Sequence, residues 1–199
     1  ESVREQLLTN GREIEVEDFG AGSAVIPYKK RKIKDIAASS LKKKKYAQLL
    51  FRIAKYYDAK IIVELGTSFG ISTSYLASAN SDSQIFTYEG AKSIAQIATE
   101  NFNSLQLKNI DLIEGSFEKT LPFFANKIEN IDLLFVDGNH RKDPTLEYFN
   151  FFLSKATNNS IFIFDDIHWS HEMEEAWTLI QNHDAVTLTI DLFFIGLIF

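Results

Sequence analysis

Residues 60–70 read KIIVELGTSFG, and this stretch decides the fold. Its first half, from Lys60 to Leu65, is a short run rich in Ile and Val that ends at Gly66, which is typical of a strand buried in a sheet. The pattern of residues 71–79 then predicts a helix. A glycine-bearing loop that opens a helix presents backbone N–H groups, which can bind an anion. The stretch therefore predicts a strand–loop–helix unit with a ligand site at its loop.

Strands and helices alternate along the rest of the chain. Strands are predicted at 60–65, 84–89, 110–114, 131–137 and 160–165, and helices at 71–79, 91–105, 117–126, 144–154 and 172–181. This alternation predicts crossover connections and a mostly parallel sheet. The apolar segments 186–191 and 192–199 leave no room for a helix between them, which predicts a strand pair at the sheet edge. We therefore expect an α/β protein with a Rossmann-like, doubly wound, mostly parallel seven-stranded sheet, an antiparallel last strand and an N-terminal helical extension.

The N-terminal part of the chain has a different pattern. The first thirty or so residues are polar with interspersed glycine and proline, which predicts an irregular arm with a short helix. Apolar residues at spacings of three and four predict one helix over 36–57. We expect residues 1–57 to form an arm and helical cap, and residues 58–199 to form one compact, ligand-binding domain.

Two basic runs lie in this N-terminal part, at 29–34 and at 42–45. Such a run is most often the solvated face of a helix, and the alternative is a rim that attracts an anionic partner. The net charge of −6 argues against a protein that clamps long nucleic acid.

Composition excludes several classes of site. The 199 residues include no cysteine, which excludes disulfides, thiolate zinc sites, iron–sulfur centres and cysteine nucleophiles. No apolar stretch approaches the roughly 20 residues of a membrane-spanning helix, and the first residues carry no secretory signal. We expect a cytoplasmic protein without membrane partners.

Acidic residues stand where the predicted strands end. Ligands of open α/β sheets bind beyond the carboxyl ends of the strands. Glu89 ends the second strand, roughly twenty residues after the glycine loop, where a carboxylate can accept both hydroxyls of a ribose. The alternative is an exposed acid in a turn. Asp137 follows the fourth strand, and Asp165 and Asp166 follow the fifth.

The run from Lys45 to Ile167 resembles the class I S-adenosylmethionine-dependent methyltransferases, most closely the catechol O-methyltransferase-like small-molecule branch. The matching motifs, in chain order, are KYAQLL at 45–50, VELGTSFG at 63–70, TYE at 87–89, EGS at 114–116, LFVDG at 134–138 and IFDD at 163–166.

The resemblance implies a cofactor site for S-adenosylmethionine. Glu64, Gly66, Gly70 and Ser72 would surround its methionine end, with Thr67 and Ser68 in the same loop. Glu89 and Gly90 would hold the ribose, Ser116 and Phe117 would flank the adenine, and Asp137 would lie between cofactor and acceptor.

The resemblance also implies a Mg²⁺ site at Asp137, Asp165 and Asp166. Converging carboxylates repel one another unless a proton or a cation neutralises them, and a hard divalent ion suits oxygen ligands. Ca²⁺ or Mn²⁺ would also suit this ligand set. The alternative is that Asp165 or Asp166 caps the next helix or faces solvent. Asp166 departs from the family, which has Asn there.

His140 stands where the catechol enzymes carry a lysine general base, so we expect His140 and Asp137 to be catalytic. The alternative is a surface histidine in a loop. His168 and Trp169 follow the fifth strand and are candidates for the acceptor pocket, although Trp169 could instead pack under a loop.

Together these features predict an S-adenosylmethionine-dependent methyltransferase that acts on a small-molecule hydroxyl with help from a divalent metal. A metal-independent transfer to an amine or a sugar is the main alternative. An NAD-dependent oxidoreductase is disfavoured by the missing third glycine of the dinucleotide motif, and a non-catalytic binding module stays open. The apolar edge at 192–199 would allow a homodimer.

Overall fold

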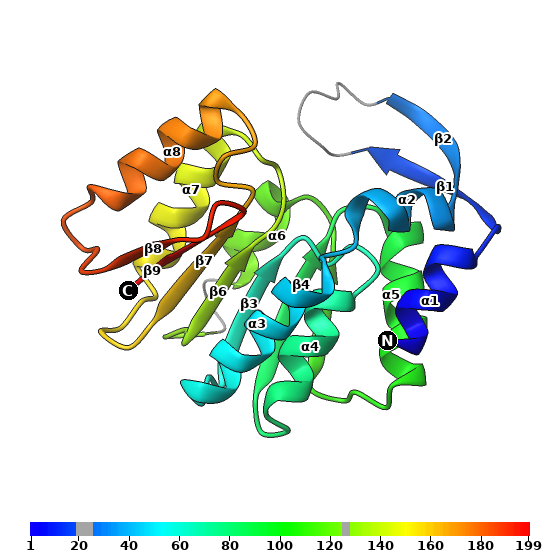
Figure 1. Ribbon diagram of the computed structural model, residues 1–199, viewed down its shortest axis with the longest axis horizontal. Helices are drawn as coiled ribbons and strands as arrows, with labels where there is room; N and C mark the ends of the chain where they lie inside the picture. The colour runs from blue at the N-terminus through cyan, green and yellow to red at the C-terminus, as the bar shows by residue number, and fades with distance from the viewer. Residues whose placement is uncertain (19–25, 125–127) are drawn as a thin grey trace.

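The computed structural model describes residues 1–18, 26–124 and 128–199, and these form a three-layer α/β protein (Figure 1). Its main sheet has seven strands in the order β5-β4-β3-β6-β7-β9-β8. Their bounds are β3 Ile61–Leu65, β4 Gln84–Glu89, β5 Ile110–Glu114, β6 Leu133–Val136, β7 Ile161–Asp165, β8 Thr189–Asp191 and β9 Ile195–Ile198. The first five run parallel, whereas β9 is antiparallel to both β7 and β8. The predicted fold class is confirmed.

Helices cover both faces of this sheet. Their bounds are α3 Lys44–Tyr56, α4 Ile71–Ala79, α5 Lys92–Ser104, α6 Phe117–Phe124, α7 Lys142–Leu153 and α8 His171–Gln181. Helices α3 and α4 pack on one face, and α6, α7 and α8 pack on the other. The chain order reverses between β3 and β6, which is where ligands of doubly wound sheets bind.

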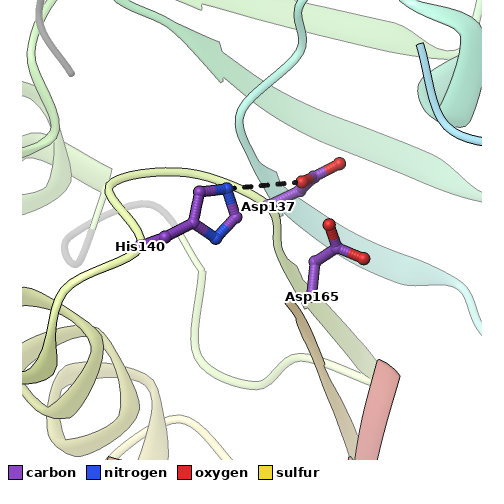
Figure 2. Close-up of side chains that lie close together, drawn as sticks. All are labelled: Asp137, His140 and Asp165. Atoms are coloured by element: carbon purple, nitrogen blue, oxygen red, sulfur yellow. Dashed lines mark ion pairs between the residues drawn. The ribbon is translucent and has the colours of Figure 1, made fainter. Parts of the chain in front are cut away.

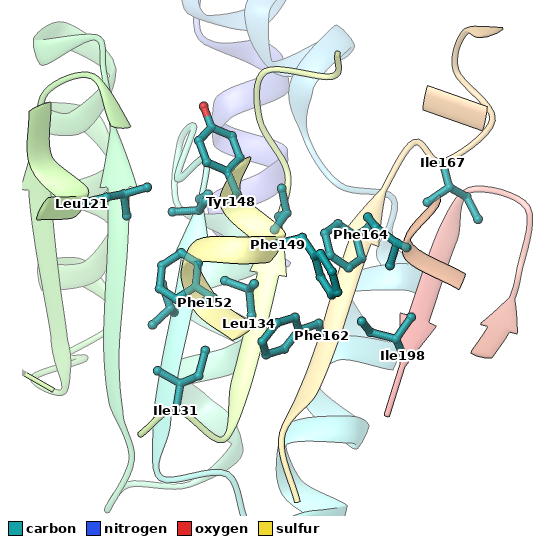
Figure 3. Packing of buried hydrophobic residues seen from close by; sticks show 14 of the residues in the cluster. Leu121, Ile131, Leu134, Tyr148, Phe149, Phe152, Phe162, Phe164, Ile167 and Ile198 are labelled. Carbon is teal, nitrogen blue, oxygen red and sulfur yellow. The ribbon is translucent and has the colours of Figure 1, made fainter. Parts of the chain in front are cut away.

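The central strands are apolar because both of their faces are covered. Every residue of β6 and of β7 is buried. On one face, aromatic rings from α7 pack against β7, with Phe149 edge-on to Phe162 at a centroid distance of 6.3 Å (Figure 3). This rigid layer fixes the strand ends from which the functional side chains project.

The N-terminal part differs from the prediction in two ways. The arm contains the short helix that was predicted, α1, Ser2–Thr9, but it also contains an antiparallel hairpin of β1, Glu13–Asp18, and β2, Ile26–Lys32, which was not predicted. The part of that arm at 19–25 lies outside the described residues, as do positions 125 and 126 of the helix predicted at 117–126.

The predicted single helix over 36–57 is wrong. It is divided into α2, Ile33–Ser40, and α3, with an extended segment at Leu41–Lys43 between them. Leu41 closes α2 in an extended conformation, with its N–H donating to the carbonyl of Ala37. This break turns the start of the second basic run toward the end of the sheet instead of leaving it on a helix face.

No helix among the described residues is long and apolar enough to cross a membrane.

Candidate active site

The loop after β3 is built around two glycines with positive φ. Gly66 has φ +105°, and a Cβ there would lie 2.1 Å from the carbonyl oxygen of Asp137. Gly70 has φ +78°, and a Cβ there would lie 2.3 Å from the ring of Phe102 on α5. Only glycine allows both this backbone conformation and these approaches. The loop therefore lies directly against Asp137, the residue that follows β6.

Glu89 holds this loop from the neighbouring strand. Its Oε2 accepts the backbone N–H of Ser68 over 2.9 Å, and its Oε1 accepts that of Ala91 over 2.9 Å. Burial raises the pKa of Glu89, while these N–H groups act against the rise. The carboxylate is thus a fixed part of the strand-end architecture, which excludes the alternative of a free acid in an exposed turn.

Glu64 lies beneath the loop in the core of the sheet. Its side chain is fully buried, and its Oε2 accepts hydrogen bonds from the hydroxyls of Thr73 and Thr87. Its Oε1 has no hydrogen-bond partner among the described residues. Burial raises the pKa of Glu64 above its ordinary value. A buried polar atom without a partner marks a place where a ligand group can bind.

Asp137 and Asp165 converge at the ends of β6 and β7, and His140 faces them (Figure 2). One ligand atom from each of these three residues lies within 4.8 Å of the other two, and Nε2 of His140 is 3.9 Å from Oδ1 of Asp137. Asp166, which was predicted as the third ligand, borders the same cavity but is not part of this cluster. The N-cap of α8 is Ser170, so neither Asp165 nor Asp166 caps that helix.

The cation between the two carboxylates comes from the chain itself. Nζ of Lys42 lies 3.0 Å from Oδ2 of Asp137 and donates a short hydrogen bond to Oδ2 of Asp165. The Lys42 side chain is 10% exposed, so the expectation that this basic run is a solvated face is wrong at this residue. The extended segment between α2 and α3 brings the lysine here.

The pKa values in this cluster follow from burial and from the neighbouring charges. Burial and the nearby Asp137 raise the pKa of Asp165 to about 7, although Lys42 opposes the rise. Burial alone would lower the pKa of Lys42, but Asp137 and Asp165 raise it well above its ordinary value. Lys42 is therefore a cation at neutral pH.

Burial favours the neutral form of the His140 imidazole. Burial lowers its pKa, and Lys42 acts in the same direction, whereas Asp166 and Asp165 oppose the change. Its side chain is 28% exposed and borders the cavity, so it is placed to accept a proton there.

A cavity of about 990 Å³ lies over these strand ends, at the upper end of the range for small-molecule sites. Of the residues predicted to bind cofactor, seven border it, namely Gly66, Ser68, Glu89, Gly90, Ser116, Phe117 and Asp137. The other four, Glu64, Thr67, Gly70 and Ser72, are not among the described lining residues. Thr67, for example, is buried and hydrogen-bonds the hydroxyl of Thr87 over 2.6 Å.

The two predicted acceptor residues have different positions. Trp169 borders the cavity with 72% of its surface exposed, so it does not pack under a loop. His168 is not among the described residues that line the cavity, and its imidazole lies between Glu174 and Asp191 instead.

Several lining residues were missed by sequence reasoning, and Lys42 is the most important of them. Tyr46 and Phe194 also border the cavity, with ring centroids 5.9 Å apart. Residues 42–45 are four identical lysines, so the sequence does not show that the environment of Lys42 differs from that of the other three.

The sheet order and the strand-end cavity define the class I S-adenosylmethionine-dependent methyltransferase fold. A family model described as "Methyltransferase domain" matches residues 63–167, from β3 to just beyond β7. The chain belongs to this methyltransferase family.

Individual relatives are more distant. The chain is 38% identical over 76 residues to the tRNA (guanine-N(7)-)-methyltransferase of Mycoplasma mobile, covering 38% of each chain. It is 27% identical over 144 residues to the O-methyltransferase imqG of Aspergillus flavus, covering 69% of this chain and 56% of that one. It thus spans well under two thirds of these curated relatives.

A similar solved structure is the O-methyltransferase from Bacillus cereus in complex with SAH. The TM-score is 0.70 at 22% identity, with 80% of this chain and 83% of that chain covered. This likeness is one of fold.

Proposed function

We propose that this protein transfers a methyl group from S-adenosylmethionine to a hydroxyl oxygen of a small molecule. The observation that carries the proposal is that Glu89 with the Gly66 loop, and His140 with Asp137, border one cavity. The first pair suits an adenosyl cofactor, and the second suits removal of a proton from an acceptor.

The cofactor site fits the residues present. Glu89 borders the cavity and offers carboxylate oxygens for the ribose. Gly66 borders the same cavity, and because it has no side chain the loop lies close against the backbone of Asp137. Ser116 and Phe117 border the cavity at the end of β5, where the adenine would lie.

When bound, S-adenosylmethionine supplies a sulfonium methyl carbon, to which the acceptor oxygen bonds as the carbon–sulfur bond breaks and leaves a neutral thioether. His140 accepts the proton of the acceptor hydroxyl. Asp137 lies 3.9 Å from the imidazole and stabilises it once it is protonated. The remaining task of the chain is to hold acceptor and cofactor in line, which the rigid strand ends do.

The acceptor side is aromatic in character. Tyr46, Trp169 and Phe194 border the cavity beside the acidic pair. Rings of this kind favour a flat, partly apolar body on the acceptor.

A divalent metal stays a prediction. Asp137, His140 and Asp165 offer suitable ligand atoms, but the Lys42 ammonium already lies on both carboxylate groups and would repel a metal ion bound there. The residues as arranged therefore do not fit a metal ion together with Lys42.

Calorimetric titration tests the cofactor assignment. We expect saturable binding of S-adenosylmethionine and none of NAD. Transfer of label from methyl-tritiated cofactor to a panel of hydroxyl, amine and sugar compounds then identifies the acceptor class. Binding of NAD instead, or label on amines alone, would contradict the proposal.

A further inference from the structure

We propose that the ammonium group of Lys42 is the resident cation of the Asp137–Asp165 pair and does the work of a divalent metal at the acceptor oxygen. This inference rests on the proposed function, because it assigns a role at the same site.

The first argument is geometric. Lys42 Nζ contacts Oδ2 of both carboxylates and lies over the ring of Phe135, 5.6 Å from its centroid. The Lys42 side chain is 10% exposed, that of Asp137 is 16% exposed and that of Asp165 is 5% exposed. A cation that bridges two neighbouring strand ends in this way stands where a metal bridging the same oxygens would stand.

The second argument is that Lys42 is unlike its neighbours. The next three lysines are exposed and are engaged elsewhere. Lys43 lies over the ring of Phe194, Lys44 pairs with Glu1, and Lys45 lies over the ring of Tyr46. Only the first lysine of the run is buried against the acids. The bend between α2 and α3 thus places the positive charge of Lys42 beside Asp137 and Asp165.

The third argument concerns charge. Asp137 and Asp165 would repel each other without a cation, and one ammonium leaves the pair with a single negative charge at most. A divalent ion bound to the same two carboxylate groups would be repelled by the positive charge of Lys42. The built-in cation and the metal are therefore alternatives, not partners.

The role of Lys42 follows from its donors. An ammonium has three N–H groups. Lys42 Nζ contacts two carboxylates, those of Asp137 and Asp165. We assign the third N–H to the acceptor oxygen, because Lys42 borders the cavity. Such a contact lowers the pKa of the bound hydroxyl and orients it while His140 takes the proton, as a metal ion would.

Manganese binding tests the inference without an acceptor. Mn²⁺ is added to the wild-type protein and to Lys42→Ala, and the free ion is measured by electron paramagnetic resonance. We expect no site in the wild type at about 100 μM Mn²⁺, which is roughly tenfold above the weakest Ca²⁺ sensor-site dissociation constants, and one site in Lys42→Ala. We expect Asp165→Asn, combined with Lys42→Ala, to abolish that site. Lys45→Ala is the matched control and should behave like the wild type.

A wild-type Mn²⁺ site that Asp165→Asn removes would overturn the inference, and so would the absence of a site in Lys42→Ala. If Lys42→Ala does not fold, Lys42→Gln is used in its place. A Mn²⁺ site in the wild-type protein contradicts the inference whichever variant is used. Titration of the same samples with S-adenosylmethionine tests the proposed function separately. A wild type that binds neither Mn²⁺ nor the cofactor contradicts the proposed function, whereas one that binds both contradicts the role of Lys42.

Discussion

The backbone N–H of Ser68 donates to Oε2 of Glu89 over 2.9 Å, which ties the glycine loop of β3 to the tip of β4. The two residues are 21 positions apart, and both border the cavity. Glu89 therefore fixes the shape of the loop, and in the proposed site it would also present its carboxylate to a ribose.

Glu89→Gln should weaken S-adenosylmethionine binding by about 10- to 100-fold, because a charged hydrogen bond of roughly 1.5–3 kcal/mol is lost. The amide also cannot accept at both ends, as the carboxylate does for Ser68 and Ala91. Calorimetric titration measures the change. Glu114→Gln is the control, because Glu114 is the register partner of Glu89 on β5 and is exposed. Equal effects of the two variants would count against a ribose contact.

Gly66→Ala should destabilise the fold by several kcal/mol, on the order of the strain of a forbidden backbone conformation plus a clash. A Cβ there would lie 2.1 Å from the carbonyl oxygen of Asp137, which belongs to the backbone and cannot swing away. Urea unfolding measures the loss. Gly11→Ala meets nothing within 4 Å and should leave stability nearly unchanged. A Gly66→Ala protein as stable as the Gly11→Ala control would show that the loop is not fixed as described.

His140→Gln should lower turnover by about 10²- to 10⁴-fold, which is the usual contribution of a general base. Cofactor affinity should stay the same, because His140 contacts the acceptor side. Steady-state rates on an acceptor found in the screen, together with calorimetry, separate the two effects. Loss of cofactor binding with unchanged turnover would exclude the base role.

The wild-type rate should fall on the acid side, with a midpoint below the ordinary histidine pKa of about 6.5. Burial lowers the pKa of His140, so the neutral form that accepts a proton persists to lower pH and is lost only as the pH drops through that lowered value. Asp166, Asp165 and Lys42 are the charged groups that bear on it. A pH profile of kcat/KM measures the midpoint, and a value above 6.5 would contradict the assignment.

Thr73→Val should cost about 1–3 kcal/mol of unfolding free energy, since it removes a hydrogen bond from a buried carboxyl group. Thr73 is fully buried, and its hydroxyl donates to Glu64. Thr73→Ser keeps the hydroxyl and should recover most of the loss. Thr99→Val, on the exposed face of α5, is the control. Denaturant unfolding that ranks Thr99→Val as the more damaging change would refute this account of Glu64.

The sheet could be predicted closely because its information is local. The structure has β4 at Gln84–Glu89, β5 at Ile110–Glu114 and α4 at Ile71–Ala79, which are the predicted bounds. Buried strands need continuous apolar runs, and such runs are visible in the sequence.

The hairpin of β1 and β2 was missed because its strands are polar. Its register pairs Glu13 with Lys32 and Glu15 with Lys30, so opposite charges face each other across the two strands. Such cross-strand pairs stabilise a ribbon but do not produce an apolar pattern. Two signals could have revealed it, namely the alternation of Ile14 and Val16 with acids in β1 and the complementary charge between the two segments.

The site could be predicted only in part, for a similar reason. Acids at strand ends follow from the chain order alone, whereas the contact of Lys42 with Asp165 joins residues 123 positions apart. Nothing in a run of lysines says which member is buried. That depends on the bend at Leu41–Lys43, which was predicted as continuous helix.

The placement of Lys42 on the acidic pair has a pharmacological consequence. Compounds that inhibit by chelation, with two adjacent oxygens wrapped around a bound ion, would find an ammonium group at that position, which offers hydrogen bonds but no open coordination positions. Selective inhibitors of this protein would instead need an anionic or hydrogen-bond-accepting group aimed at the lysine. The same difference would allow them to spare enzymes that depend on a metal.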